Sequence, residues 1–185
     1  MDNPKKSLAE INTMDYEAFI SHFGNVIENC SLIAAAVWKE QPFRDVFHLH
    51  EVLCSFVDCL PGSGQEGILR SHPDLAGRLA ASGELTTESS FEQRSAGLSN
   101  LTSDEKAELT DMNGRYREKF GFPFVVCARQ NKKESIFEGL RMRLQNTAEE
   151  EVAKGIQEVK KICHLRLLDL VVQEDIESKY LFWFS

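Results

Sequence analysis

The sequence lacks several features that would point away from a single globular domain. No stretch approaches the ~20 apolar residues of a membrane span, and residues 1–10 lack the apolar run of a signal peptide. There is no internal repeat, no low-complexity tract and no linker rich in proline or glycine. We therefore expect one soluble, intracellular domain, large enough to enclose a core without disulfides or a structural metal.

Cysteine, histidine and basic residues are also arranged in ways that exclude function classes. The 5 cysteines form no Cys-x-x-Cys pair, which indicates reduced thiols. His48 and His50 have no third ligand at zinc-site spacing, so we expect no metal. A net charge of −8 without a basic cluster argues against nucleic-acid binding, although one buried arginine could still bind a small anion.

The last residues do not form a Ser-Lys-Leu address, which leaves a peroxisomal or a cytosolic location open.

Helical patterns dominate the sequence that is present. Apolar spacing, capping sequences and prolines predict helices over residues 13–23, 32–38, 47–60, 65–71, 86–98 and 102–120, and a long final helix after Thr147. The only strand-like piece is Phe122 to Cys127, which could be a short edge strand or an extended crossover between helices. The pattern predicts an all-α, single-domain multi-helix bundle with one short extended crossover segment.

Two segments place polar side chains where they could act on a ligand. His72 precedes Pro73, which restricts the histidine backbone and removes a neighbouring N–H. The imidazole could be a general acid or base, or a helix-end histidine satisfied by local carbonyls. Helical spacing puts Ser89, Glu92 and Gln93 on one face of the helix over 86–98, as a ligand site or as a solvated face.

Arg166 lies on the apolar stripe of the final helix. A buried guanidinium without an anion is very costly, so this side chain needs a partner. A substrate oxygen would serve. An internal ion pair, with Asp169 at i+3 or with a carboxylate elsewhere, would serve equally well.

Several short motifs occur in a fixed order along the chain. The most specific are His72-Pro-Asp-Leu-Ala76 and Phe120-Gly-Phe-Pro-Phe124. The others are Phe23-Gly24, Ala34-Ala-Ala-Val-Trp38, Gly67-Ile-Leu-Arg-Ser71, Glu92-Gln93 with Ala96-Gly-Leu98, Ala128-Arg129, and Glu158-Val-Lys-Lys-Ile162 before Arg166. This ordered set resembles the 2-oxo-4-hydroxy-4-carboxy-5-ureidoimidazoline (OHCU) decarboxylase family over about residues 12–172. Residues 1–11 then form an N-terminal extension, and residues 173–185 form a tail whose aromatic cluster differs from the family's usual terminus.

The resemblance implies a reaction, an assembly and a set of site residues. It implies cofactor-free, stereoselective decarboxylation of OHCU to (S)-allantoin in urate breakdown, by an all-helical homodimer that binds a small-molecule substrate. His72 would be the essential catalytic residue and Glu92 its polar partner. The residues implied to bind the substrate are Pro73, Ser89, Ser90, Phe91, Glu92, Gln93, Phe124, Val125, Val126, Cys127, Ala128 and Arg166. Ser71 stands where relatives often have cysteine, a small change that should leave the role of His72 intact.

Two other functions are compatible with the residues alone. In the first, the polar face of residues 86–98 and the aromatic tail form a docking surface of a non-enzymatic helical interaction module. In the second, the chain is a hydrolase of the same pathway, which would consume water without releasing carbon dioxide.

Overall fold

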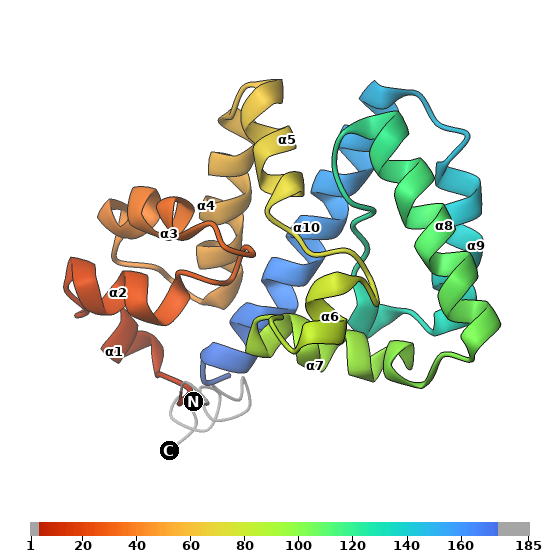
Figure 1. The fold of residues 1–185 in the computed structure, drawn as a ribbon. Helices are drawn as coiled ribbons and strands as arrows, with labels where there is room; N and C mark the ends of the chain where they lie inside the picture. The colour runs from red at the N-terminus through yellow and green to blue at the C-terminus, as the bar shows by residue number, and fades with distance from the viewer. Residues whose placement is uncertain (1–3, 174–185) are drawn as a thin grey trace, which may run out of the picture.

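The long helix α10 (Ala148–Leu170) crosses the middle of the molecule, and the other helices pack around it (Figure 1). This computed structural model describes residues 4–173. The other α-helices are α1 (Leu8–Ile11), α2 (Tyr16–Phe23), α3 (Ser31–Val37), α4 (Val46–Cys59), α5 (Gly62–Arg70), α6 (Arg78–Ser82), α7 (Thr87–Ser95), α8 (Ser103–Phe120) and α9 (Lys133–Arg143). Three short 3₁₀ helices are η1 (Trp38–Glu40), η2 (Leu98–Asn100) and η3 (Ala128–Gln130). Within the described residues, α10 contacts α2, α4, α5 and α8.

The sequence features that predict α10 also account for its position. Thr147 caps its first turn in a capping box with Glu150, as predicted. Ile156, Val159 and Cys163 recur at helical spacing and are buried among the surrounding helices. The buried stripe makes α10 the central helix of an all-α fold, which confirms the predicted fold class.

Most predicted helices are present, with shifted ends. The helix predicted over 13–23 begins at Tyr16, because Asp15 caps it, and the one predicted over 86–98 ends at Ser95, before Gly97 at φ 81°. Three helices were not predicted, namely α1, α6 and α9. The edge-strand alternative for 122–127 is wrong, because this segment is extended but unpaired, and residues 4–173 contain only an isolated bridge between Lys6 and Val171.

The first described residues are joined to the end of α10. The Lys6 N–H donates to the Leu170 carbonyl at 2.9 Å, and the Val172 N–H donates to the Lys6 carbonyl at 2.9 Å. Ile11 is fully buried in the core, although it belongs to the predicted extension 1–11. The predicted tail lies outside the described residues from position 174 onward. No helix within 4–173 is long and apolar enough to cross a bilayer.

Close packing of α5 on α10 fixes the position of the turn that carries His72. A Cβ at Gly155 of α10 would lie 2.8 Å from Cδ2 of Leu69, a fully buried residue of α5. We therefore expect Gly155→Ala to lower the free energy of unfolding by about 1–3 kcal/mol, the usual cost of overpacking a core. Urea denaturation would measure this loss. Unchanged stability would mean that α5 and α10 can move apart to make room for the methyl group.

Candidate active site

A small cavity lies where α7, α10, the turn after α5 and the extended crossover meet. It is lined by His72, Pro73, Leu75, Ser89, Glu92, Gln93, Phe124, Val125, Val126, Ala128 and Ile162. The structure thus brings together nine of the sequence-predicted site residues from segments far apart in the chain: His72, Pro73, Ser89, Glu92, Gln93, Phe124, Val125, Val126 and Ala128. Its volume of about 30 Å³ accommodates one or two water molecules, so the walls must move apart when a larger ring enters.

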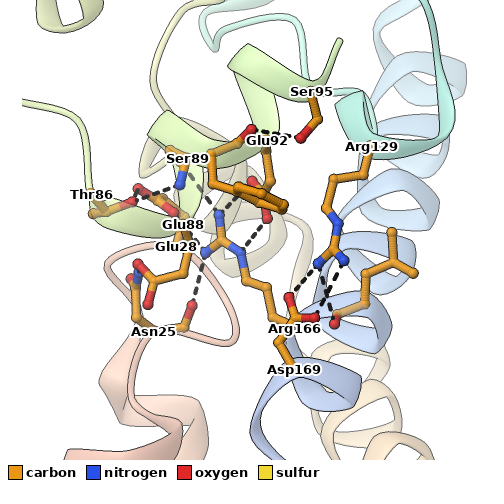
Figure 2. Close-up of polar contacts among 12 residues, drawn as sticks. Asn25, Glu28, Thr86, Glu88, Ser89, Glu92, Ser95, Arg129, Arg166 and Asp169 are labelled. Atoms are coloured by element: carbon orange, nitrogen blue, oxygen red, sulfur yellow. Dashed lines mark hydrogen bonds and ion pairs between the residues drawn. The ribbon is translucent and has the colours of Figure 1, made fainter. Parts of the chain in front are cut away.

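Four predicted site residues are not part of this lining. Ser90 borders a separate hollow, and Phe91 is 48 % exposed, with the Arg129 guanidinium over its ring. Cys127 is buried, and its N–H donates to the Glu158 carboxylate at 2.8 Å. Arg166 does not line the cavity but pairs with Glu92, which does (Figure 2). Along α7, therefore, it is the predicted helical face, with Ser89, Glu92 and Gln93, that borders the cavity.

His72 is held in one tautomer by the helix that precedes it. Its Nδ1 lies 2.9 Å from the carbonyl oxygen of Ile68. Because a carbonyl oxygen only accepts, Nδ1 carries the hydrogen and Nε2 keeps a lone pair. Nε2 is buried and has no hydrogen-bond partner within residues 4–173. The ring therefore has one nitrogen left to act on a ligand.

Burial determines the charge of this imidazole. Removal from water, with a smaller effect of the Arg166 charge, lowers the pKa of His72 to about 4, against the opposing effects of the Ile68 hydrogen bond and Glu28. The histidine is therefore neutral near pH 7. A neutral ring with a free Nε2 is suited to take a proton from a ligand.

Arg166 is the centre of a buried ion cluster that also contains Glu28 and Glu92 (Figure 2). Its Nε and Nη2 donate to the two oxygens of Glu92 at 2.7 and 2.8 Å, and Nη2 also donates to Ser89 Oγ at 3.3 Å. Its Nη1 donates to Glu28 Oε2 at 2.7 Å and to the Asn25 carbonyl at 2.8 Å. These bonds use all five guanidinium N–H groups. Arg166 therefore reaches the cavity through Glu92, and a direct contact with a ligand would require an exchange of one of these bonds.

The sequence leaves open whether an internal ion pair of Arg166 would involve Asp169 or a carboxylate elsewhere in the chain. The ion pair is with carboxylates from elsewhere in the chain, while Asp169 pairs instead with Arg129. Glu28 is a site residue that sequence reasoning missed. Its only local signal is a charge next to Val26 and Ile27, both buried. A carboxylate in such an apolar run needs a cation, but the sequence does not identify it.

Charged side chains hold the extended crossover at two positions. Arg143 of α9 donates from Nη1 to the Val125 carbonyl at 2.7 Å and forms an ion pair with Glu151, which is fully buried on α10. At the last residue of the segment, Glu158 accepts from the Cys127 N–H. The N–H groups of Val125 and Val126 have no partner among the described residues, so they are free to donate to a ligand.

No group of three or more His, Cys, Asp or Glu side chains within residues 4–173 is arranged to hold a metal ion. The two histidines of the His48-Leu49-His50 motif have different local partners. His48 Nδ1 accepts from the Arg44 N–H at 3.2 Å, and His50 Nε2 lies 2.9 Å from the Lys160 carbonyl.

Comparisons with known proteins agree on one family. The family model described as OHCU decarboxylase matches residues 12–168. A protein of Xenopus laevis named 2-oxo-4-hydroxy-4-carboxy-5-ureidoimidazoline decarboxylase is 51 % identical over 172 residues, which cover 93 % of this chain and 98 % of that protein. A protein of Mus musculus with the same name is 49 % identical over 164 residues, covering 89 % of this chain and 92 % of that protein.

Two solved structures share the fold. One, described as (S)-allantoin synthase, superposes with a TM-score of 0.74 at 22 % identity and covers 92 % of this chain and 56 % of that one. The other, described as OHCU decarboxylase in the presence of (S)-allantoin, superposes with a TM-score of 0.62 at 19 % identity and covers 83 % of this chain and 96 % of that one.

Proposed function

Because this chain belongs to the OHCU decarboxylase family, we propose that it decarboxylates 2-oxo-4-hydroxy-4-carboxy-5-ureidoimidazoline to (S)-allantoin, without a cofactor, in urate breakdown. It is a carboxy-lyase. The observation that carries the proposal is the neutral His72 ring, which shares a cavity with Glu92 and has a buried Nε2 without a partner in the described residues.

The substrate itself supplies the electron sink for this reaction. The bond to the carboxylate breaks, and its electron pair moves into the adjacent ring C=N group while the ring nitrogen takes a proton from solvent. The result is an enol that keeps the 4-hydroxyl group. Transfer of the hydroxyl proton to the neighbouring ring carbon then gives the carbonyl of allantoin and sets its stereocentre.

We assign this proton transfer to His72. Its free Nε2 takes the proton of the 4-hydroxyl group and delivers it to one face of the neighbouring carbon, which regenerates the neutral ring. The Nδ1–H tautomer supports this order, since Nε2 can only accept a proton at the start. Stereoselectivity follows if the cavity presents a single face of the ring to Nε2.

The other lining residues would orient the ring. Glu92, fixed by Arg166, would bind the same 4-hydroxyl oxygen, in keeping with its position on the shared wall. Gln93 Oε1 accepts from the Ala76 N–H at 2.8 Å, which leaves its amide NH₂ to donate to a substrate oxygen. The Val125 and Val126 N–H groups would satisfy the ureido and ring oxygens.

Circular dichroism of the product tests the function directly. The ureidoimidazoline formed from fresh urate-oxidase product is incubated with the protein while carbon dioxide is measured. We expect rapid release of carbon dioxide and accumulation of one allantoin enantiomer. Water consumption without carbon dioxide release would favour the hydrolase alternative, and binding without turnover would favour the interaction module.

The pKa of His72 gives the expected pH profile of this reaction. Because the free base is the active form and the pKa of His72 is about 4, kcat/KM should stay level from neutral pH down to about pH 5 and decline as pH falls through about 4. Steady-state rates from pH 8 down to about pH 3, corrected for spontaneous decay, measure this acid limb of the pH profile. A decline of kcat/KM with an apparent pKa near 6.5, the ordinary value for histidine, would contradict a desolvated His72.

We further propose a homodimer in a reducing compartment, either the peroxisome or the cytosol. Leu32 of α3 and Phe47 of α4 are 72 % and 61 % exposed, and apolar side chains of this kind are suited to a subunit contact. All five cysteines are free thiols, in keeping with a reducing environment. Light scattering would give the mass of the assembly, and Phe47→Glu should shift it towards the monomer if this face is the contact.

A further inference from the structure

Glu28 connects three of the elements that form the site, although it does not line the cavity. It lies in the turn between α2 and α3 and is 1 % exposed. Its Oε1 accepts from the hydroxyl of Thr86, the N-cap of α7, at 2.8 Å, and its Oε2 accepts from Arg166 Nη1 at 2.7 Å (Figure 2). Its carbonyl accepts from the hydroxyl of Ser71, the residue before His72, at 2.7 Å. One residue thus contacts α7, α10 and the turn that carries His72.

The charges of this cluster do not balance. Arg166 and Glu92 alone would form a neutral, bidentate pair. Glu28 adds a second carboxylate to the same guanidinium, so the buried cluster carries one excess negative charge when both acids are ionised. An excess buried charge costs free energy. The same negative charge would stabilise a positive charge that forms close by during the reaction.

Proton transfer to His72 is such a step. The charged groups packed around His72 in the interior are Glu28 from the α2–α3 turn, Glu92 from α7 and Arg166 from α10. On the solvent side, a hollow of about 270 Å³ borders His72 and Glu28. Its other charged lining residues are Asp74, Glu84, Arg70, Arg78 and Arg117, and Arg70 is paired with Glu66 outside the lining, so the signs of these other groups balance. The net negative charge near the ring therefore comes from the interior cluster.

We propose that Glu28 is a positioning residue for the proton transfer, holding Arg166 against Glu92 and supplying the negative charge that stabilises the His72 imidazolium. The inference rests on the proposed function. In the step concerned, the O–H bond of the 4-hydroxyl group breaks as an N–H bond forms at Nε2, and that N–H bond breaks as the C–H bond of allantoin forms. Glu28 touches neither the substrate nor the proton.

The test compares Glu28→Gln with the wild type in turnover and in binding. Glutamine keeps an oxygen for Arg166 but removes the charge. We expect kcat to fall about tenfold or more, since one pKa unit of lost stabilisation corresponds to a tenfold rate change. Affinity for (S)-allantoin, which is neutral and needs no imidazolium, should change little. Because Glu28 raises the pKa of His72, its loss should also move the acid limb of kcat/KM to lower pH.

Two further variants complete the design. Glu28→Asp keeps the charge and should restore most of kcat. Glu88→Gln removes an equal charge from an exposed residue of α7 and should behave as the wild type.

The inference is overturned if Glu28→Gln turns over at the wild-type rate. It is also overturned if kcat and allantoin affinity fall together with no movement of the acid limb and no rescue by aspartate, because that pattern marks a purely structural role. Should the glutamine variant fail to fold, Glu28→Asp decides, since a tenfold loss with the charge still present would contradict the proposal. A wild-type protein that releases no carbon dioxide would instead refute the proposed function.

Discussion

Replacing His72 by asparagine should abolish stereoselective decarboxylation while leaving the helical fold in place. The asparagine amide can still donate to the Ile68 carbonyl, but nothing replaces the basic nitrogen at Nε2. General acid–base catalysis by a positioned side chain contributes about 10²–10⁴-fold, so kcat should fall by at least that range towards the uncatalysed rate. The product should then be racemic allantoin, measured by circular dichroism alongside carbon dioxide release.

A matched variant separates the role of this imidazole from the general effect of losing a histidine. His48→Asn alters a half-buried residue of α4 outside the cavity and should keep the wild-type kcat. Calorimetry should find that His72→Asn still binds (S)-allantoin, because the other lining residues are intact. Normal turnover by His72→Asn would remove the histidine from the mechanism.

Removing the guanidinium of Arg166 should have the largest effect on stability. In Arg166→Met, Glu28 and Glu92 remain buried without their cation, and breaking a buried ion pair from one side costs about 3–5 kcal/mol. For a chain of this size, that loss corresponds to a Tm lower by roughly 6–20 °C. Thermal and urea unfolding at pH 7 would measure both quantities.

Two variants are controls for the loss of stability in Arg166→Met: one breaks a more exposed ion pair, and the other also removes one of the two buried carboxylates. Arg129→Met breaks the pair with Asp169, which is about half exposed, and should cost no more than about 1 kcal/mol. Adding Glu28→Gln to Arg166→Met should recover part of the stability, since one buried carboxylate then remains instead of two. An Arg166→Met protein as stable as Arg129→Met would show that the cluster is hydrated or protonated rather than a buried ion network.

Local patterns predicted the parts of the fold that depend on neighbouring residues. The stripe of Ile156 and Val159 and the Thr147 capping box predicted α10, and i, i+3, i+4 spacing predicted which face of α7 borders the cavity. The helix α9 was missed, although Ile136, Phe137 and Leu140 are buried, because charged residues dominate this short segment. Its role, holding the Val125 carbonyl through Arg143, depends on tertiary packing.

Sequence reasoning named nine residues that line the cavity, but it missed Glu28 and the contacts that connect these side chains. The apolar stripe around Arg166 showed that this residue needs an anion, yet its partners Glu28 and Glu92 lie 138 and 74 positions away. No local rule selects among the 29 acidic residues at such separations. Likewise, the His72-Pro73 pair indicated a fixed histidine, but only the structure identifies the Ile68 carbonyl as its partner and hence Nε2 as the free nitrogen.

Nitrogen-15 NMR of the histidine side chains at pH 7 tests the protonation state on which the mechanism depends. The signals of His72 can be assigned by their absence in His72→Asn. We expect a protonated Nδ1 and an unprotonated Nε2, which shifts when (S)-allantoin binds. An imidazolium at pH 7, or a hydrogen on Nε2 instead of Nδ1, would contradict a base that starts with its lone pair facing the substrate.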